Sequence, residues 1–198
     1  TLTPVFTTMN QTRRVGDIVY NSGGMQQTIQ EGQTATRQLQ GDSWIWHNDI
    51  GYIVPSGNDS AFIEARTVSG NYNLVGTSDR AVSEPVATFW FNHGPQPQGK
   101  NYSYIMLPAV SVEETEAAAA EPHVNVLHHS DSIHAVAHHL TRSVGIAFFE
   151  AGTVEISDGV DVTVDAPALV ILRNRLGGME VTVSDPEYRL TDLTLEIG

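Results

Sequence analysis

A run of aromatic and branched residues at positions 44–55, Trp-Ile-Trp-His-Asn-Asp-Ile-Gly-Tyr-Ile-Val-Pro, constrains the fold more than any other part of this sequence. It concentrates two indoles, an imidazole and a phenol on a short stretch that ends in proline, as in a buried antiparallel strand or hairpin arm. Burying one large apolar side chain stabilises a fold by about 1.5–3 kcal/mol. The run therefore predicts the centre of a β-sheet core, with residues 87–91 and 102–107 as neighbouring strands.

The composition excludes several classes of function. The chain has 198 residues, enough for one large or two small domains, and 40% of them are hydrophobic. Ten basic residues stand against 23 acidic ones, which gives a net charge of −13 and disfavours non-specific binding to nucleic acid or anionic membranes. There is no cysteine, so disulfide and thiolate chemistry are excluded. Because Thr1 does not open a signal peptide, we expect a mature or excised piece.

Short strands separated by turn residues dominate residues 1–111. Alternation predicts that Phe62, Glu64 and Arg66 share one side of their strand. Glycine and proline predict turns, and residues 25–42 are polar enough for a long hairpin or an edge loop. The expected strands are 3–10, 17–20, 44–54, 61–68, 86–92 and 102–107, and the expected loops or long turns are 21–24, 55–60, 69–78 and 93–99.

The composition changes at residues 112–122, where glutamate and alanine predict a short helix that Pro122 ends. We interpret this segment as a linker between a first domain at 1–111 and a second at 123–198. Short strands recur in the second domain at near-regular spacing and predict a smaller antiparallel β-sandwich. The expected strands are 124–127, 133–137, 144–149, 160–164, 168–173, 179–184 and 193–197.

Four segments, in this order, resemble the C-terminal half of polysaccharide lyase family 8, which includes hyaluronate, chondroitin and xanthan lyases. Residues 7–12, Thr-Thr-Met-Asn-Gln-Thr, are similar to the family's T-T-x-N-Q strand, and residues 46–52 resemble its W-x-H-x-x-G-Y strand in relaxed form. Residues 93–108 resemble its H-G…Y-x-Y-x-x-x-P block. Residues 132–136, 145–149 and 183–186 resemble its small terminal sandwich, with His134 where the family has glutamine.

This resemblance implies an all-β fold, in which a partial β super-sandwich precedes a smaller C-terminal antiparallel β-sandwich. It implies a secreted, extracellular lyase that cleaves hyaluronan, chondroitin or xanthan by β-elimination and leaves unsaturated uronate ends. The family's catalytic Asn, His, Tyr and Arg lie on an α/α toroid that precedes the β region, and no segment here resembles that toroid. We therefore expect no catalytic residue in this chain, which would form one wall of the substrate cleft beside an upstream toroid or partner chain.

His47 and Tyr52 superficially offer the base and acid that such an elimination needs. On a single strand, a separation of five residues would place them on opposite faces. The neighbouring Trp44 and Trp46 indicate a core. We therefore interpret both residues as structural.

Six histidines between residues 123 and 139 raise the question of a metal site. A zinc ion needs three or four converging ligands, whereas His134 and His138 lie two residue pairs apart on an extended strand. Surface histidines are the favoured interpretation, and no metal is predicted there. Glu113, Glu114 and Glu116 could hold a structural calcium ion, although a solvated helical face accounts better for them. No other cofactor is predicted.

Arginine and tyrosine are the side chains best suited to an anionic sugar, because guanidinium pairs with carboxylate and an aromatic ring stacks on a sugar face. Arg37, Arg66, Asn71 and Tyr72 fall in or beside expected loops and are the predicted substrate-binding residues. Exposed salt bridges with the abundant acids are the alternative for each arginine. Arg13 and Arg14 are adjacent, so one must point outward.

A second function remains open at the level of sequence. The chain could be a stand-alone carbohydrate-binding or adhesin-like β module without catalysis. A self-contained module would cover its own apolar faces, whereas part of a larger enzyme would expose an apolar patch where the rest belongs.

Overall fold

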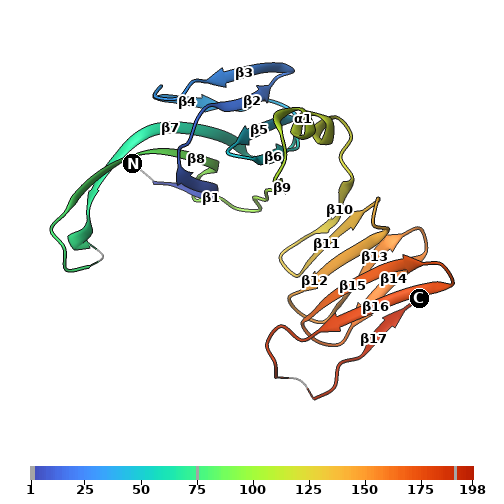
Figure 1. Ribbon diagram of the computed structural model, residues 1–198. Helices are drawn as coiled ribbons and strands as arrows, with labels where there is room; N and C mark the ends of the chain where they lie inside the picture. The colour runs from blue at the N-terminus through green and yellow to red at the C-terminus, as the bar shows by residue number, and fades with distance from the viewer. Residues whose placement is uncertain (1–2, 75, 190) are drawn as a thin grey trace. The chain divides into compact units, whose positions relative to one another are not determined.

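The computed structural model describes residues 3–74, 76–189 and 191–198, and it is built almost entirely from antiparallel strands (Figure 1). The chain divides into two compact units, Thr1–Glu121 and Pro122–Gly198. Each unit has two sheets and its own hydrophobic core. The predicted all-β class, with a partial super-sandwich before a smaller sandwich, is confirmed. No helix in the described ranges is long and apolar enough to cross a membrane.

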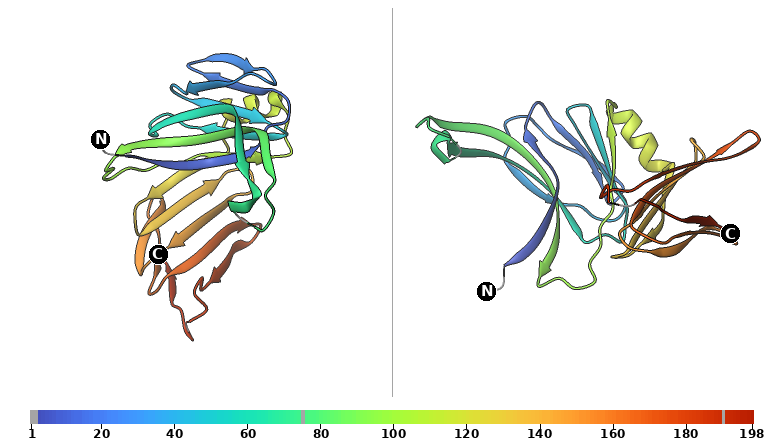
Figure 2. Two further views of the ribbon diagram at one scale, coloured as in Figure 1. Left: turned by 90° about the vertical axis from the view of Figure 1, so that its left-hand side faces the viewer. Right: turned by 90° about the horizontal axis from the view of Figure 1, so that it is seen from below.

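The first unit contains a four-stranded and a five-stranded sheet. The four-stranded sheet has the order β1-β8-β7-β4 and the five-stranded sheet the order β3-β2-β5-β6-β9. Residues 68–71 of β7 pair with residues 81–84 of β8 and form a two-stranded arm that projects from the rest of this unit (Figures 1 and 2). The four-stranded sheet comprises β1 (Pro4–Arg13), β4 (Ala35–Gln38), β7 (Ser60–Asn71) and β8 (Ala81–Pro95); the five-stranded sheet comprises β2 (Ile18–Ser22), β3 (Met25–Ile29), β5 (Ser43–His47), β6 (Ile50–Val54) and β9 (Ile105–Pro108).

Alternation along the strands sends one set of side chains into the core between these sheets. Ile63 and Phe89 from the four-stranded sheet and Ile45 and Tyr52 from the five-stranded sheet are fully buried. The run at 44–55 forms the hairpin β5–β6, whose turn residues Asn48 and Asp49 both have positive φ, at 51° and 61°. This stretch is central to the core, as the sequence predicted.

Helix α1 (Val112–Ala120) is the predicted helix, and it packs on the hairpin β5–β6 of the first unit. Ser111 caps it: the Ser111 hydroxyl accepts from the Glu114 N–H, and the Glu114 carboxylate accepts from the Ser111 N–H. Thr115 is completely buried over Gly51, and Trp46 Nε1 donates to the Val110 carbonyl at 2.7 Å. The first compact unit therefore includes this helix.

The second unit is a sandwich of a five-stranded sheet, β10-β11-β12-β15-β16, and a three-stranded sheet, β13-β14-β17. Seven of its strands coincide with the predicted ones, whereas β13 was missed. The strands are β10 (Val124–His129), β11 (Ile133–His138), β12 (Ser143–Phe148), β13 (Gly152–Ser157), β14 (Val160–Val164), β15 (Ala168–Arg175), β16 (Gly178–Ser184) and β17 (Leu195–Ile197).

Several local predictions were wrong: at 69–71 and 93–95 strand pairing overrides local turn signals, and at 102–104 a run with strand propensity does not form a strand. Residues 69–71 belong to β7, since they pair with residues 81–83, and a short 3₁₀ turn, η1 (Tyr72–Leu74), follows. Residues 93–95 belong to β8, with Pro95 at its end opposite Pro4. Residues 25–42 contain two strands, β3 and β4, in different sheets. The strand predicted at 102–107 begins only at Ile105.

Candidate functional site

Two of the predicted substrate-binding residues, Arg37 and Arg66, lie on opposite faces of the four-stranded sheet. Arg37 is on β4 rather than in a loop, and it pairs with Ile63, whose side chain enters the core. Arg66 is three residues after Ile63 on β7, so its side chain lies on the opposite face of the sheet. These two arginines cannot form one wall together.

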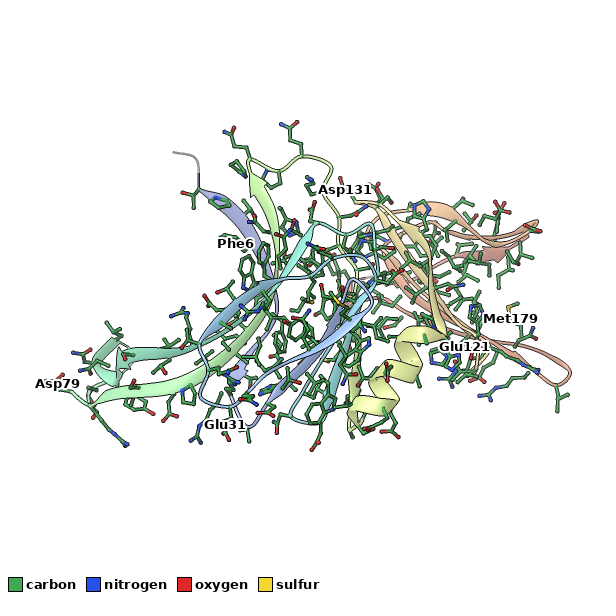
Figure 3. The ribbon with its side chains drawn as sticks, turned by 90° about the horizontal axis from the view of Figure 1, so that it is seen from above. Phe6, Glu31, Asp79, Glu121, Asp131 and Met179 are labelled. Carbon is green, nitrogen blue, oxygen red and sulfur yellow. The ribbon has the colours of Figure 1, made fainter. Side chains whose placement is uncertain are left out.

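The other two predicted residues, Asn71 and Tyr72, lie together on the arm formed by β7 and β8. Asn71 Nδ2 donates to Asp79 Oδ1 at 2.9 Å, and the Arg80 guanidinium carbon is 6.0 Å from the centre of the Tyr72 ring. Asp79 marks the end of this arm (Figure 3). Asn71 is five residues from Arg66, roughly 17 Å along an extended strand. The four residues therefore do not form a single cluster, and their role in substrate binding stays a prediction.

The face of the four-stranded sheet that points away from the core carries an aromatic cluster. We call it the outer face, and define it by the side chains opposite in direction to Phe89 and Ile63. The Phe62 and Trp90 rings stack with centroids 4.3 Å apart and planes 9° apart. Phe6 meets Trp90 edge-on at 5.0 Å, is 50% exposed, and lies near the start of β1 (Figure 3). The predicted common side of Phe62, Glu64 and Arg66 is this face.

Two arginines lie further along the outer face. Arg13 and Arg66 pair with Val86 from its two sides, so all three side chains share one cross-strand row. Each guanidinium has a carboxylate partner: Arg13 Nε is 3.1 Å from Glu84 and Arg66 Nε is 2.7 Å from Glu64. The arginine side chains are 72% and 48% exposed. Sequence reasoning singled out Arg66 but missed the aromatic cluster, which the alternation of Trp90 with Phe89 and Phe91 could have indicated.

Thr7, His93, Asp59 and Lys100 form a polar chain that sequence reasoning also missed. His93 Nε2 is 2.8 Å from the Thr7 hydroxyl, and its Nδ1 is 2.7 Å from Asp59 Oδ2. Lys100 Nζ donates to Asp59 Oδ1 at 2.8 Å. Burial opposes ionisation of Asp59, but the hydrogen bonds from Lys100 and His93 outweigh it and lower the pKa of this carboxyl. The His93 side chain is only 7% exposed. We therefore interpret these four residues as a structural hydrogen-bond network that connects β1, β8 and two loops.

His47 and Tyr52 lie on the same face, and the prediction of opposite faces was wrong. The turn at residues 48–49 puts them on neighbouring strands, where Ile45 pairs with Tyr52. Both rings contact Phe89, and both residues are buried. Burial and the nearby Arg14 charge lower the pKa of His47, whereas burial raises the pKa of Tyr52. Such enclosed groups are unsuited to contact with a polymer.

Arg14 is a buried cation, and its guanidinium donates to four backbone carbonyl groups. Its side chain points inward while Arg13 points outward, which agrees with the prediction that one of the pair must be exposed. The guanidinium donates to the carbonyl oxygens of Ile29 at 2.8 Å, Gln33 at 2.6 Å, Gly16 at 3.3 Å and Gln30. It therefore joins the loop after β1 to the β3–β4 turn.

The histidines of the second unit do not gather into a metal site. His129 and His134 are directly opposite on β10 and β11, with ring centroids 4.5 Å apart, and Phe149 packs on His134. His138 lies at the other end of β11, opposite Val124. Within residues 3–74, 76–189 and 191–198, no three His, Cys, Asp or Glu side chains are placed to hold a metal ion. Among the glutamates considered for calcium, Glu114 serves the helix cap.

Family models match almost the whole chain. Residues 1–119 match the super-sandwich domain of polysaccharide lyase family 8, and residues 125–194 match the C-terminal beta-sandwich domain of the same family. Several curated proteins are similar, among them chondroitin, hyaluronate and xanthan lyases. Chondroitinase-AC of Pedobacter heparinus is 27% identical over 98% of this chain, and chondroitin sulfate ABC exolyase of Proteus vulgaris is 30% identical over 70% of it. The chain spans only 27% and 14% of the lengths of these proteins.

Solved structures show the same fold. A chondroitinase AC lyase structure is 26% identical and superposes on the whole of this chain with a TM-score of 0.86, although the chain covers 29% of that protein. A Paenibacillus xanthan lyase is 22% identical and superposes on 93% of this chain with a TM-score of 0.79, where the chain covers 18% of it. The latter comparison concerns the fold alone.

Proposed function

This chain belongs to polysaccharide lyase family 8, and on that premise we propose that it is the β-rich portion of an enzyme that cleaves an acidic polysaccharide by β-elimination. The observation that carries this proposal is the succession of both family domains along the chain, residues 1–119 and 125–194. The relatives are named for chondroitin, hyaluronate and xanthan. All three are acidic polymers, so the proposed substrate is a polymer of this class.

The proposed reaction removes the C5 proton of a uronate and breaks the bond between C4 and the glycosidic oxygen. A base accepts the proton, an acid protonates the departing oxygen, and a C4–C5 double bond forms. Polar groups must also stabilise the charge that develops on the uronate carboxylate. The buried His47 and Tyr52 are enclosed in the core, so we propose that these roles fall to an α/α toroid upstream or on a partner chain.

We propose that this chain supports the fold and forms one wall of the substrate cleft. Two exposed regions of the first unit are candidates for that wall: the arm with Asn71 and Tyr72, and the outer face with Arg66. Since polymers of this kind occur outside cells, the proposed enzyme is secreted.

The test is to assay this chain alone and combined with the toroid region of the same enzyme. Each sample is incubated with hyaluronan, chondroitin sulfate and xanthan, and unsaturated uronate is followed by its ultraviolet absorbance. We expect product only from the combination. Product from this chain alone would contradict the placement of the catalytic groups outside it. If every combination fails to give product, the proposed lyase activity is wrong.

A further inference from the structure

We propose that Arg14 and His47 form an acid-sensitive latch, which holds one edge of the first unit closed at neutral pH and releases it when His47 gains a proton. The latch joins two segments, residues 14–17 after β1 and residues 30–34 between β3 and β4. The inference concerns a conformational change within the first unit, and it does not depend on the proposed activity.

The segment at 30–34 connects the two sheets of the first unit at their edges. Among the described strands, β3 has β2 as its one neighbour in the five-stranded sheet, and β4 has β7 as its one neighbour in the four-stranded sheet. β4 has four residues, and four of the five residues of β3 are exposed. Elements with few buried contacts open locally at a lower free energy than the core. Contacts beyond strand pairing are therefore important for keeping this edge closed.

Arg14 supplies such contacts from the segment after β1. The residue is 5% exposed. Its guanidinium donates to the carbonyl oxygen of Ile29, at the end of β3, and to those of Gln30 and Gln33 in the following turn. Because one guanidinium makes all three bonds, a movement of this side chain breaks them together.

His47 contacts the same segment through its ring. Its Nε2 accepts the N–H of Val15 at 3.3 Å, and Val15 follows Arg14 directly in the chain. The histidine is 2% exposed. A ring nitrogen that accepts a hydrogen bond carries no proton, so this contact requires the neutral imidazole. A proton on Nε2 would face the Val15 N–H, and the ring would become a second buried cation beside Arg14.

Arg14 is the charged group that acts on His47. Burial, and then the Arg14 charge, lower the pKa of His47. The strands packed on the ring present uncharged groups: Phe89 of β8 lies 6.2 Å away between ring centroids, and Ile50 of β6 is directly opposite. Tyr52 of β6 also contacts Phe89, and burial raises the pKa of its phenol, which stays neutral.

The acids of the two segments are exposed and bind backbone groups. Glu31 Oε1 accepts the N–H of Gly16 at 3.2 Å, and Asp17 Oδ1 accepts the N–H of Glu31 at 2.7 Å. Asp49, in the turn after His47, is exposed as well. Burial and the neighbouring guanidinium therefore dominate the response of His47 to acid.

Opening of the latch relieves the conflict, because water can then solvate both cations. In the open form His47 binds a proton with its ordinary pKa of about 6.5, whereas the closed form binds it only at lower pH. Below about pH 6.5 the open population therefore rises by up to about tenfold per pH unit, until the folded pKa is reached. Opening exposes Ile29, which is 2% exposed in the closed form.

Hydrogen–deuterium exchange of the 198-residue chain at pH 7.5 and pH 5.5 measures this opening, with rates corrected for intrinsic exchange at each pH. Protection at residues 15–16 and 29–33 should fall about tenfold at pH 5.5, while residues 144–148 in β12 keep theirs. Equal protection of the two segments at both pH values would overturn the latch. So would a uniform loss across both units, which indicates global unfolding. This comparison needs no variant.

Variants then assign the effect to the two residues. His47→Gln retains an acceptor for the Val15 N–H but does not titrate, so protection should be the same at both pH values. Arg14→Met should lower the protection of both segments already at pH 7.5. His134→Gln replaces an exposed histidine of the second unit and should leave the tenfold loss unchanged. A loss that persists in His47→Gln, or that His134→Gln abolishes, would overturn the proposal.

Discussion

Arg14 shows how a single residue can hold two loops together through hydrogen bonds to backbone carbonyl groups. The carbonyls of the β3–β4 turn satisfy its guanidinium, so the charge is solvated by backbone dipoles in place of water. Arg13, its neighbour in sequence, forms only an exposed ion pair. The contrast between the two follows from their directions: one faces the core and the other leaves the outer face.

Replacing Arg14 with Met should destabilise the chain by about 3 kcal/mol, because several buried carbonyl groups lose their donor. Arg13→Met is the matched control and should change the free energy of unfolding by less than about 0.5 kcal/mol. Urea denaturation followed by tryptophan fluorescence measures both. Equal effects of the two substitutions would show that the carbonyl cage of Arg14 contributes nothing.

Asp59 should give the fold a dependence on acid pH. Its pKa is lowered in the folded state, so its contribution to stability is present above the unfolded value of about 3.9 and is lost as pH falls through the lower folded value. Asp59→Asn should therefore lower stability at neutral pH and flatten its decline at acid pH. Unfolding curves over this range measure the effect, and an unchanged slope would contradict it.

His47 should also make the stability of the fold depend on pH, in a higher pH range than Asp59, because its charged form is a cation. Burial lowers its pKa, and its Nε2 accepts the Val15 N–H at 3.3 Å, which requires the neutral ring. The unfolded chain binds a proton near its ordinary pKa of about 6.5, so stability should fall as pH drops below that value towards the folded pKa. His47→Gln should remove this part of the pH profile. A profile identical to that of the unmodified chain would rule the effect out.

At the level of elements, the contact between α1 and β6 depends on a missing side chain. A Cβ at Gly51 would lie 2.5 Å from Thr115 Oγ1, and Gly51 sits on a regular strand, so space rather than backbone conformation selects glycine here. The helix can approach the hairpin because nothing projects between them.

Gly51→Ala should cost about 1–3 kcal/mol, since either α1 or β6 must move. Gly145→Ala provides the control, because the nearest side-chain atom to a Cβ there is 3.8 Å away. Thermal unfolding monitored by circular dichroism compares the two variants. Similar melting temperatures would mean that the helix relaxes freely.

The chain has two hydrophobic cores, one in each compact unit, and the unfolding of the first unit can be followed separately. All three tryptophans, Trp44, Trp46 and Trp90, are in the first unit, whereas Val162 is completely buried in the second core. Val162→Ala should destabilise the second unit by about 2 kcal/mol through the cavity it leaves. The tryptophan fluorescence midpoint should stay constant while the circular dichroism transition shifts. A common shift of both signals would show that the units unfold together.

The sequence by itself determined the class of fold, the family resemblance, the place of the 44–55 run in the core and the helix that Pro122 follows, whereas the turn that divides this run into two strands was not predicted. These features depend on local patterns: alternation of apolar residues, glycine and proline at turns, and a run of glutamate and alanine that a proline ends. The resemblance drew on the same segments in their order along the chain, and the family models confirm it.

Only the tertiary structure decided which residues meet. It put His47 and Tyr52 on one face, separated Arg37 from Arg66, and assembled Thr7, Asp59, His93 and Lys100 from four distant segments. The spacing of residues in the sequence does not predict such contacts. Alternation along a strand predicts which side chains share a face, but the partner strand and the register are set by pairing between distant segments. The outer face, with Phe6, Phe62 and Trp90 from three different strands, exists for that reason only in the folded chain.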